Sequence, residues 1–494
     1  MNYENKFTTH NIPEVSFPDG LRDETKYTFS ITYTDQHSMD YAKFAETTKD
    51  IILKDGNSLA PYPDPQGYPD LRNLISERLS NLRGIETDPD SIVITGGAGG
   101  AISTLLDIFV EPNDTVLIEE FSYLGTLAML LSRRANVVHI DCDDEGIVPE
   151  SLEENLADLK SKNITPKFMY LISVFQNPTG ITIPLHRRKA ILEIAQKYNV
   201  PIIENESYAD FRIDGDPLPP AMYGIDDTDS VMYISAYTKF LGCGIRIGYT
   251  VVPDMVKEEL AKTAFNGMPS QLASMAVFNY LDKHGYQHGL EVEQSIMKKR
   301  DAMLTALKEN FPDTCEWNKP NGGLMVWLKL PEGANSWDIL RSAVDRGVKY
   351  NPGGVRQWTS MYGSNSADLL YAVTTDTSNN IIVTGSTYGR MTGTRTPDND
   401  EDVFVAKYYD NGTMQWINQF YTVGSEWGYG VTTDSDDNIY VSGATTNDLG
   451  DGASNAGQKD FFLMKLYGDN GTKQWTKQMG TAWDEFAYDV AVST

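Results

Sequence analysis

Residues 235–249 read Ser-Ala-Tyr-Thr-Lys-Phe-Leu-Gly-Cys-Gly-Ile-Arg-Ile-Gly-Tyr, and this stretch decides how the rest of the chain is interpreted. It follows an apolar run with strand character, residues 231–234. Lys239 lies seven residues before Arg246, across a bend that contains glycine. A lysine amine in a partly buried turn near other cations has a lowered proton affinity, which suits it to form a Schiff base. Arg246 carries a planar fork of donors that can grip a phosphate.

The composition is that of an acidic globular chain. It has 494 residues, of which 40% are hydrophobic and 22% charged, and its formal net charge is −28 at pH 7. This length exceeds one ordinary core, so we expect at least two domains. The negative charge would repel nucleic acid and anionic membranes, and we expect neither as a partner.

The sequence suggests neither an export signal nor a metal site. Its first thirty residues lack a basic start followed by an apolar run, and no stretch has the length needed to span a bilayer. The three cysteines, Cys142, Cys243 and Cys315, are too far apart to indicate a disulfide framework or a zinc site. We therefore expect a cytoplasmic protein without a metal.

A glycine run after a strand predicts a phosphate site. Residues 91–95 are typical of a buried strand, Gly96-Gly97-Ala98-Gly99-Gly100 follow, and residues 101–109 have a helical pattern. Backbone N–H groups at a helix start attract anions, and the helix dipole adds to this attraction. The run has neither the spacing of a dinucleotide fingerprint nor the lysine and hydroxyl of a nucleotide-triphosphate loop. A purely structural glycine turn is the alternative.

Two further candidates follow strand-like runs. Tyr123 comes just after the run 115–118, where an aromatic ring can stack on a flat heterocycle. A buried core tyrosine is the alternative. Asn177 follows the run 168–175 and opens an Asn-Pro-Thr-Gly turn, and its amide can donate a hydrogen bond that favours an ionised oxygen. Asn-Pro turns are common, so this motif is weak alone.

Two more segments contribute candidates. Residues 201–210, which contain Asn205 and Tyr208, follow an amphipathic helical pattern over residues 188–198. Tyr62 belongs to a proline-rich turn that precedes an amphipathic run. A simple surface turn before a helix would also explain the segment around Tyr62.

Together, and in this order along the chain, the motifs resemble those of the class I and II aminotransferases, the fold-type-I enzymes that use pyridoxal phosphate. The resemblance covers about residues 40–354. It implies an α/β fold with a mostly parallel sheet, which the alternation of strand and helix patterns also predicts. The expected parts are an N-terminal segment (1–45), a cofactor-binding large domain (46–265) and an incomplete small domain (266–354).

The resemblance implies a role for each motif residue. Lys239 would hold the cofactor covalently and move a proton during the reaction. Tyr123 would cover the cofactor ring, while Asn177 and Tyr208 would hold its phenolic oxygen. The residues that would contact the phosphate are Gly97, Ala98, Gly99, Arg246 and Tyr62. In the family the tyrosine at the position of Tyr62 reaches the cofactor phosphate of the partner subunit, so the resemblance implies a homodimer.

The chain departs from the family pattern at three places. Asn205 stands where the family has an aspartate that pairs with the cofactor's ring nitrogen, so carbanion stabilisation should be weaker unless Glu204 or Glu206 reaches that nitrogen. Ala236 stands where many members have a hydroxyl that contacts the phosphate. No arginine after Gly354 has the sequence context of the family's arginine for the substrate α-carboxylate.

After Gly354 an internal repeat begins. Residues 371–376, Tyr-Ala-Val-Thr-Thr-Asp, return as Tyr-Gly-Val-Thr-Thr-Asp at 429–434, and residues 380–385 return at the same offset of 58 residues. Each unit has about four short alternating runs, as in a propeller blade. The units resemble the β-propeller repeat modules of bacterial surface and secreted proteins. About two and a half units are present, so residues 355–494 are expected to form an all-β partial propeller.

The favoured function is transfer of an amino group between an α-amino acid and a 2-oxo acid, with pyridoxal phosphate as cofactor. Loss of the carboxylate-binding arginine would impair this activity. Both resemblances stop near Gly354, which is the pattern of a fusion or a rearranged gene. Two alternatives stay open, namely a non-catalytic chimera and a binding module built on the propeller-like segment.

Overall fold

The computed structural model describes residues 26–30, 32, 39–263, 269–285, 287–331, 334, 336–351, 368–378, 380–391, 400–409, 414–449 and 455–492. The chain divides into two compact units, His10–Arg356 and Gln357–Thr494. They are called the N-terminal unit and the C-terminal unit below. The expected junction at Gly354 lies outside the described residues.

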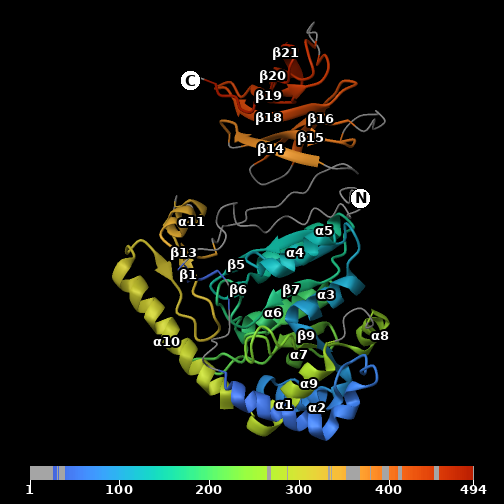
Figure 1. Cartoon of the computed structure of the whole chain (residues 1–494), viewed down its shortest axis with the longest axis vertical. Helices are drawn as coiled ribbons and strands as arrows, with labels where there is room; N and C mark the ends of the chain where they lie inside the picture. Colours follow the sequence, from blue (N-terminus) through green and yellow to red (C-terminus); the bar gives the residue numbers. More distant parts are fainter. Residues whose placement is uncertain are drawn as a thin grey trace. The chain divides into compact units, whose positions relative to one another are not determined.

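A seven-stranded sheet forms the centre of the N-terminal unit (Figure 1). Its strand order is β2-β10-β9-β8-β7-β3-β4. The strands are β2 (Ile92–Thr95), β3 (Thr115–Glu119), β4 (Asn136–Ile140), β7 (Met169–Ile172), β8 (Ile202–Asn205), β9 (Val231–Ala236) and β10 (Gly248–Val251). Strands β4, β3, β7, β8 and β9 pair in parallel, whereas β10 is antiparallel to both of its neighbours. The prediction of a mostly parallel sheet is confirmed.

Helices cover both faces of this sheet because its inner strands are apolar on both sides. On β3, Val116 and Ile118 pack in one core cluster with α3 (Gly97–Phe109) and α4 (Leu124–Ser132). Leu117 points to the opposite face. There it packs in a second cluster with the helices α5 (Pro149–Ser161) and α6 (Leu185–Lys197).

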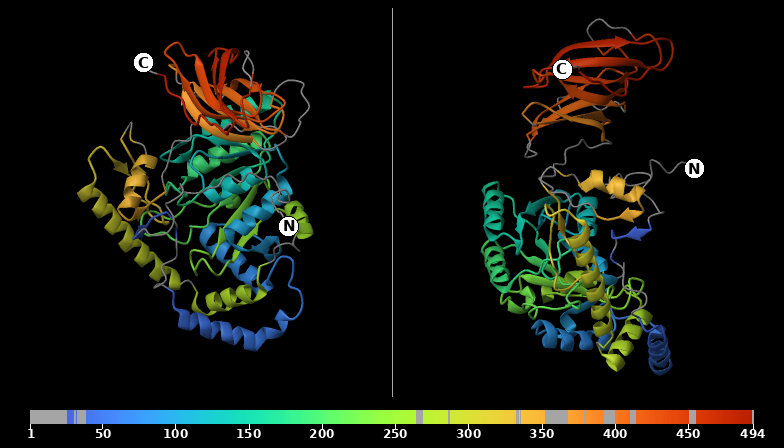
Figure 2. Two further views of the ribbon diagram at one scale, coloured as in Figure 1. Left: turned by 45° about the horizontal axis from the view of Figure 1, so that its top comes forward. Right: turned by 90° about the vertical axis from the view of Figure 1, so that its left-hand side faces the viewer.

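The other elements of the N-terminal unit flank the sheet. Figure 2 shows the long helix α10 (Gln287–Asn310) running along one side of the unit. The remaining helices are α1 (Tyr41–Asp55), η2 (Gly56–Leu59), α2 (Pro69–Arg83), η3 (Pro89–Ser91), α7 (Met222–Ile225), α8 (Asp254–Thr263), α9 (Gln271–His284) and α11 (Ser336–Asp345). The remaining short strands are β1 (Tyr27–Thr28), β5 (Cys142–Asp143), β6 (Gly146–Ile147), β11 (Glu316–Trp317), β12 (Leu328–Lys329) and β13 (Val348–Lys349).

Three predicted boundaries differ from the structure. Helix α3 begins at Gly97 rather than at residue 101, because the glycine run adopts the helical turn itself. Strand β7 ends at Ile172 rather than at residue 175, where the backbone turns out of the sheet with Phe175 at a positive φ of 46°. The strand expected within 322–331 is reduced to β12, Leu328–Lys329.

The C-terminal unit is all-β, with two four-stranded antiparallel sheets. The first sheet holds β14 (Asp368–Thr375), β15 (Ile381–Thr387), β16 (Asp402–Tyr408) and β17 (Met414–Phe420). The second holds β18 (Glu426–Thr433), β19 (Ile439–Thr445), β20 (Asp460–Leu466) and β21 (Lys473–Met479). In each sheet the strands pair in chain order, as expected for a repeated unit.

The sequence repeat is also a repeat of contacts. In the first sheet Lys407 pairs with Asp376 at 2.8 Å, and in the second Lys465 pairs with Asp434 at 3.3 Å. Tyrosine rings from equivalent positions contact one another in a row. The centroids of Tyr371 and Tyr429 are 5.1 Å apart in an edge-to-face contact, and those of Tyr429 and Tyr488 are 5.2 Å apart in a tilted contact. The third ring, Tyr488, lies in the segment after β21.

No helix among the described residues combines the length and the apolar character that crossing a membrane would require. Within the same residues, no group of three or more His, Cys, Asp or Glu side chains is arranged to hold a metal ion.

Candidate active site

Five of the predicted site residues lie at one edge of the central sheet. Strands β3, β7, β8 and β9 run in parallel, so their carboxyl ends share that edge. Strand β2 has the same direction as β9, because both are antiparallel to β10. The segments that leave these ends carry Tyr123, Asn177, Tyr208, Lys239 and Gly97. Ligands of open α/β sheets bind at such an edge.

The glycine run and the Lys239 segment meet through their backbones. Gly248 lies so close to α3 that an added Cβ would be 2.6 Å from the carbonyl carbon of Gly97 and 2.9 Å from the nitrogen of Ala98. Gly97 itself has a φ of +79°, and its added Cβ would lie 3.2 Å from the Arg246 guanidinium and 3.1 Å from the Thr238 hydroxyl. Only glycine fits at both positions.

This contact forms a cradle for an anion. Helix α3 starts at Gly97 without a side-chain cap, so its first amides face outward from the positive end of the helix dipole. Arg246 Nη2 donates to the carbonyl oxygen of Gly96 at 2.7 Å, which holds the guanidinium beside these amides. Gly99 adds no side chain, and an added Cβ would meet nothing within 4 Å. The donors present therefore fit a phosphate group.

Lys239 is half-buried and lies three residues after the end of β9. Its Nζ donates to the carbonyl oxygen of Thr32 at 2.6 Å and lies 3.7 Å from Cys243 Sγ. The amine is thus held at the same sheet edge as the cradle, next to the segment that carries Arg246.

Asn177 and Tyr208 come together although 31 residues separate them. The Asn177 Nδ2 donates to the Tyr208 hydroxyl at 3.2 Å. Burial raises the pKa of Tyr208, while hydrogen bonds with Thr32 and Asn177 act in the opposite direction. Tyr123, which is 43% exposed, also raises this pKa and packs its ring over Gly125. A ring with an oxygen substituent would find a stacking surface and two polar partners here.

Asn205 is buried with its amide oriented by neighbours. Its Oδ1 accepts from the backbone nitrogen of Ser207 at 3.0 Å and from Ser207 Oγ at 2.6 Å. Its Nδ2 donates to the Tyr170 hydroxyl at 2.8 Å. One amide hydrogen is left to face a ligand, and the residue contributes no negative charge.

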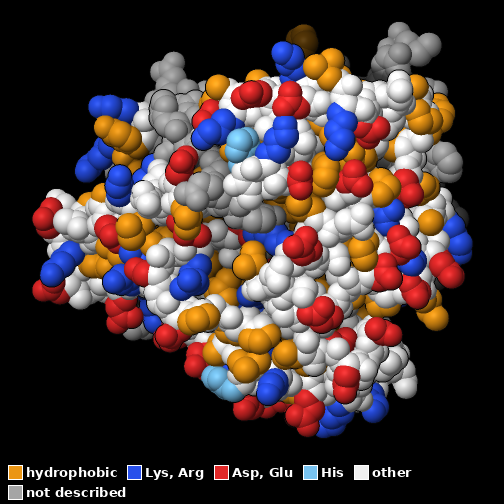
Figure 3. Space-filling view, turned by 90° about the horizontal axis from the view of Figure 1, so that it is seen from below, with side chains coloured by type: hydrophobic (Ala, Val, Ile, Leu, Met, Phe, Trp, Pro, Cys, Tyr) orange, Lys and Arg blue, Asp and Glu red, His pale blue; other side chains and the backbone are white. Residues whose placement is uncertain are grey.

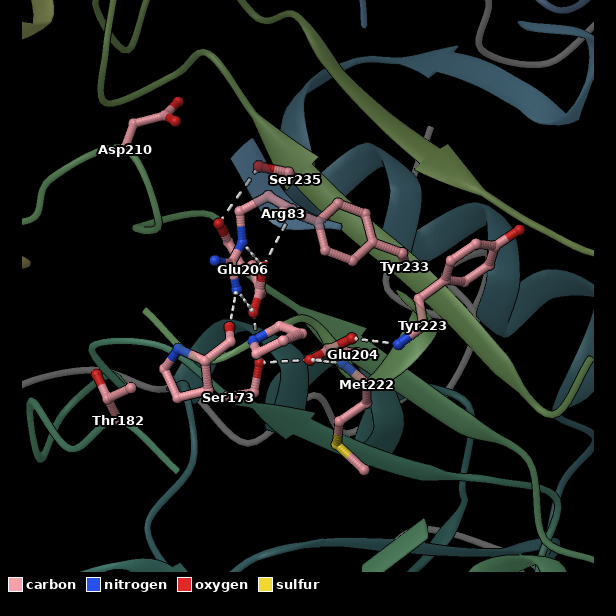
Figure 4. A network of polar contacts seen from close by, with 12 residues as sticks. Arg83, Ser173, Thr182, Glu204, Glu206, Asp210, Met222, Tyr223, Tyr233 and Ser235 are labelled. Carbon is pink, nitrogen blue, oxygen red and sulfur yellow. Dashed lines mark hydrogen bonds and ion pairs between the residues drawn. The ribbon is translucent and has the colours of Figure 1, made fainter. Parts of the chain in front are cut away.

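Neither Glu204 nor Glu206 supplies the missing charge to the site, because arginines hold both carboxylates in a buried network (Figure 4). Arg188 Nη1 lies 3.2 Å from Glu204 Oε1 and 3.0 Å from Glu206 Oε1, and all three side chains are fully buried. Arg83 pairs with Glu206 at 2.7 Å. The arginines hold the pKa of Glu206 below its usual value despite burial, whereas burial and the Glu206 charge raise the pKa of Glu204.

Three other sequence expectations have different outcomes. Tyr62 is 90% exposed, so it is presented to solvent rather than to the cradle of its own chain. Ala236 is buried and brings no hydroxyl. Of the arginines considered for the substrate carboxylate, Arg356 and Arg395 lie outside the described residues, and Arg390 is exposed in the C-terminal unit.

The sequence interpretation missed Thr32 and Thr238. Thr32 belongs to an N-terminal segment without periodic pattern, and no sequence signal points to its contact with Lys239. Thr238 had a signal, because it precedes Lys239 directly in the turn. Its hydroxyl lies next to Gly97, where it offers the oxygen that Ala236 lacks.

Glu119, at the end of β3, gives a testable pH dependence. Burial raises its pKa from 4.5 to about 8, although it accepts hydrogen bonds from the backbone of Ile172 and the amide of Gln176. Because the unfolded chain ionises at lower pH than the folded chain, this carboxyl lowers the free energy of unfolding as pH rises from about 5 to about 8. This decrease amounts to at most about 1.4 kcal/mol per pH unit, and we expect it to be absent in Glu119→Gln.

Denaturant unfolding of both proteins at about pH 5 and about pH 8 checks this expectation. The free energy of unfolding of Glu119→Gln, relative to that of the wild type, should increase with pH. The glutamine amide keeps an acceptor oxygen for the backbone nitrogen of Ile172. An advantage that is equal at both pH values would contradict the assignment.

Comparison with known proteins gives consistent results. The model of the family described as "Aminotransferase class I and II" matches residues 31–356. The aromatic-amino-acid aminotransferase 1 of Thermococcus litoralis is 32% identical over 312 residues, which are 62% of this chain and 74% of that protein. The 2-aminoadipate transaminase of Thermus thermophilus is 27% identical over 333 residues, 66% of this chain and 81% of that protein.

A solved structure is similar as well. The kynurenine aminotransferase of Pyrococcus horikoshii, crystallised with PMP, kynurenine as substrate and KYA as product, has a TM-score of 0.67 and 27% sequence identity. The match covers 72% of this chain and 89% of that one.

Proposed function

Because the chain belongs to the class I and II aminotransferases, and is therefore a pyridoxal-phosphate-dependent enzyme that moves an amino group between amino and 2-oxo acids, we propose roles for its site residues. The observation that carries the proposal is the cradle formed by Gly97, Ala98, Gly99 and Arg246 beside Lys239. The cradle would hold the cofactor phosphate, helped by the Thr238 hydroxyl.

When bound, pyridoxal phosphate supplies an electron sink for the substrate Cα. The amine of Lys239 would hold the cofactor covalently and, once released by substrate, carry a proton between Cα and C4′ of the cofactor. Asn177 and Tyr208 would hold the phenolic oxygen, and Tyr123 would cover the ring. Asn205 would face the ring nitrogen with its remaining amide hydrogen.

For the substrate side chain we propose a large planar group. The ring centroids of Trp327 and Phe121 are 5.0 Å apart, and Phe121 lies two residues before Tyr123, the predicted ring-stacking residue. One member of this aromatic pair is thus close in sequence to Tyr123. The similar proteins from Thermococcus litoralis and Pyrococcus horikoshii act on aromatic amino acids and kynurenine, as their names state. Phenylalanine and kynurenine are therefore the amino donors to test first.

We also propose a homodimer in which Tyr62 reaches the phosphate of the partner subunit. Support comes from its exposure and from the exposed apolar side chains nearby, such as Leu53 (75%) and Leu59 (39%). Figure 3 looks at the end of the unit that carries α1, α2 and α9, where apolar side chains lie among the charged ones. Analytical ultracentrifugation of the full chain tests this proposal, and a monomer would contradict it.

For the C-terminal unit we propose a partial β-propeller. For the whole chain we propose the domain limits 1–45, 46–265, 266–354 and 355–494. The order of strands within each sheet and the row of equivalent tyrosines support it. The unit would be a binding module attached to the enzyme.

The decisive experiment is a half-reaction. The purified full chain, loaded with pyridoxal phosphate, should convert phenylalanine to its 2-oxo acid and leave the cofactor in the amino form, which the absorbance spectrum records. Cofactor binding without this conversion would instead support the non-catalytic chimera. Absence of cofactor binding would refute the site assignment.

Asn205→Asp tests the role of the ring-nitrogen position. A carboxylate would stabilise a proton on the ring nitrogen and so strengthen the electron sink, and we expect the half-reaction to accelerate about tenfold, which corresponds to about 1.4 kcal/mol. The Ser207 donors remain compatible with a carboxylate. Asn279→Asp, a second buried asparagine that bonds a backbone carbonyl, is the control and should bring no gain. A folded Asn205→Asp protein that is no faster would contradict this role.

A further inference from the structure

Tyr208 lies between two acidic residues, and arginines of one helix hold both. Glu206 precedes it by two positions and Asp210 follows it by two. Arg83, the last residue of α2, donates from Nε and Nη2 to the two oxygens of Glu206, each at 2.7 Å. Arg78, on the same helix, pairs with Asp210. Figure 4 shows the Arg83 contact and the position of Asp210.

Both pairs are shielded from water. The side chains of Arg83 and Glu206 are 9% and 0% exposed, and those of Arg78 and Asp210 are 10% and 16% exposed. Removing Arg78 would take this cation away from the largely buried Asp210 carboxylate, and removing Arg83 would leave Glu206 with the Arg188 ion pair alone, so rearranging either pair is costly. The bidentate contact of Arg83 also fixes the orientation of the Glu206 carboxylate, which a lysine ammonium could not do.

A short turn connects Glu206, which is held by Arg83, with Tyr208. The backbone nitrogen of Ala209 donates to the Glu206 carbonyl oxygen at 3.0 Å, which closes the turn around Tyr208. Ser235 Oγ donates to the same oxygen at 3.3 Å. The Tyr208 ring is held by core packing and by hydrogen bonds of its hydroxyl with Asn177 and Thr32, and its backbone belongs to a turn that is anchored at both ends.

From these contacts we propose that Arg78 and Arg83 are positioning residues, which set the Tyr208 hydroxyl in the active site by clamping the turn that carries it. The proposal rests on the role of Tyr208 proposed above. It gives helix α2, which carries no residue of the proposed cofactor site, a role in positioning one of the site residues.

A double-mutant cycle tests this proposal in the full-length holoenzyme. Arg83→Met keeps an unbranched apolar stem and removes the guanidinium with its charge, and α2 keeps its buried residues Leu71, Ile75 and Leu79. We expect Arg83→Met to lower kcat/KM about tenfold and to change the visible circular dichroism of the bound cofactor. In a Tyr208→Phe background the same substitution should change kcat/KM less than about twofold.

Arg300→Met is the matched control. Arg300 is also buried, lies on α10, and pairs with Asp214 and Asp301 at 2.8 Å each, neither of which belongs to the turn of residues 206–210. It should lower Tm while leaving the cofactor dichroism and kcat/KM within about twofold. If Arg83→Met does not fold, Asp210→Asn enters the cycle instead, because its pair with Arg78 is the more exposed one.

The outcomes are distinct. Equal losses from Arg83→Met in the wild-type and Tyr208→Phe backgrounds, or an equal loss from Arg300→Met, would overturn the positioning role while leaving the aminotransferase assignment intact. A wild-type chain that binds no pyridoxal phosphate would overturn both.

Discussion

Lys239→Ala is expected to abolish amino transfer, with a loss of at least about 10⁴-fold, because it removes both the covalent attachment and the proton carrier. The variant should still bind the cofactor, since the cradle of Gly97, Ala98 and Arg246 lies on other segments. Borohydride should fix the cofactor to the wild-type chain and not to Lys239→Ala. Intact mass and the residual rate of the half-reaction measure the two effects.

Lys262→Ala serves as the control for this substitution. Lys262 is 67% exposed and pairs with Glu259 within α8, so its loss should change neither labelling nor rate. Borohydride labelling of Lys239→Ala at the wild-type level would show that another amine carries the cofactor.

Arg246→Ala is expected to weaken pyridoxal phosphate binding about 100-fold, or about 2.7 kcal/mol, because a charged hydrogen-bonding partner of a phosphate is lost. Arg246→Lys should recover part of this loss, since a lysine keeps the charge without the planar fork of donors. The cofactor dissociation constant, measured by titration of the apo-protein, gives both numbers.

Arg133→Ala provides the comparison for Arg246→Ala. Arg133 contacts the exposed Asp107 at 2.5 Å and lies outside the cradle. Its removal should leave the cofactor dissociation constant unchanged. Equal affinities of the wild-type and Arg246→Ala proteins would refute the phosphate role of Arg246.

The sequence was sufficient to predict the sheet class and the place where the motifs meet. Tyr123, Asn177, Tyr208 and Lys239 each follow an apolar run, and parallel pairing puts the ends of such runs at one edge. Local pattern therefore implied a common location even though up to 116 residues separate these side chains.

Contacts that depend on side-chain direction could not be predicted in this way. The pairs Arg83–Glu206 and Arg78–Asp210 join positions more than 120 residues apart, and a charged residue on an amphipathic helix is normally solvated. The orientation of the Asn205 amide follows from Ser207 and Tyr170, whose directions only the fold decides. The start of α3 was misplaced because glycine normally disfavours a helix, whereas here it meets the backbone of another strand.

The close approach of Gly248 to the start of α3 has a wider consequence. Neither residue at this contact offers a functional group, yet the spacing between two backbones decides whether the anion cradle and the lysine face the same ligand. A single added methyl at position 248 would push the helix away from the strand and could leave every chemically active side chain unchanged while the cofactor is lost. Vulnerability of this enzyme to mutation therefore extends to positions that contribute only by being small.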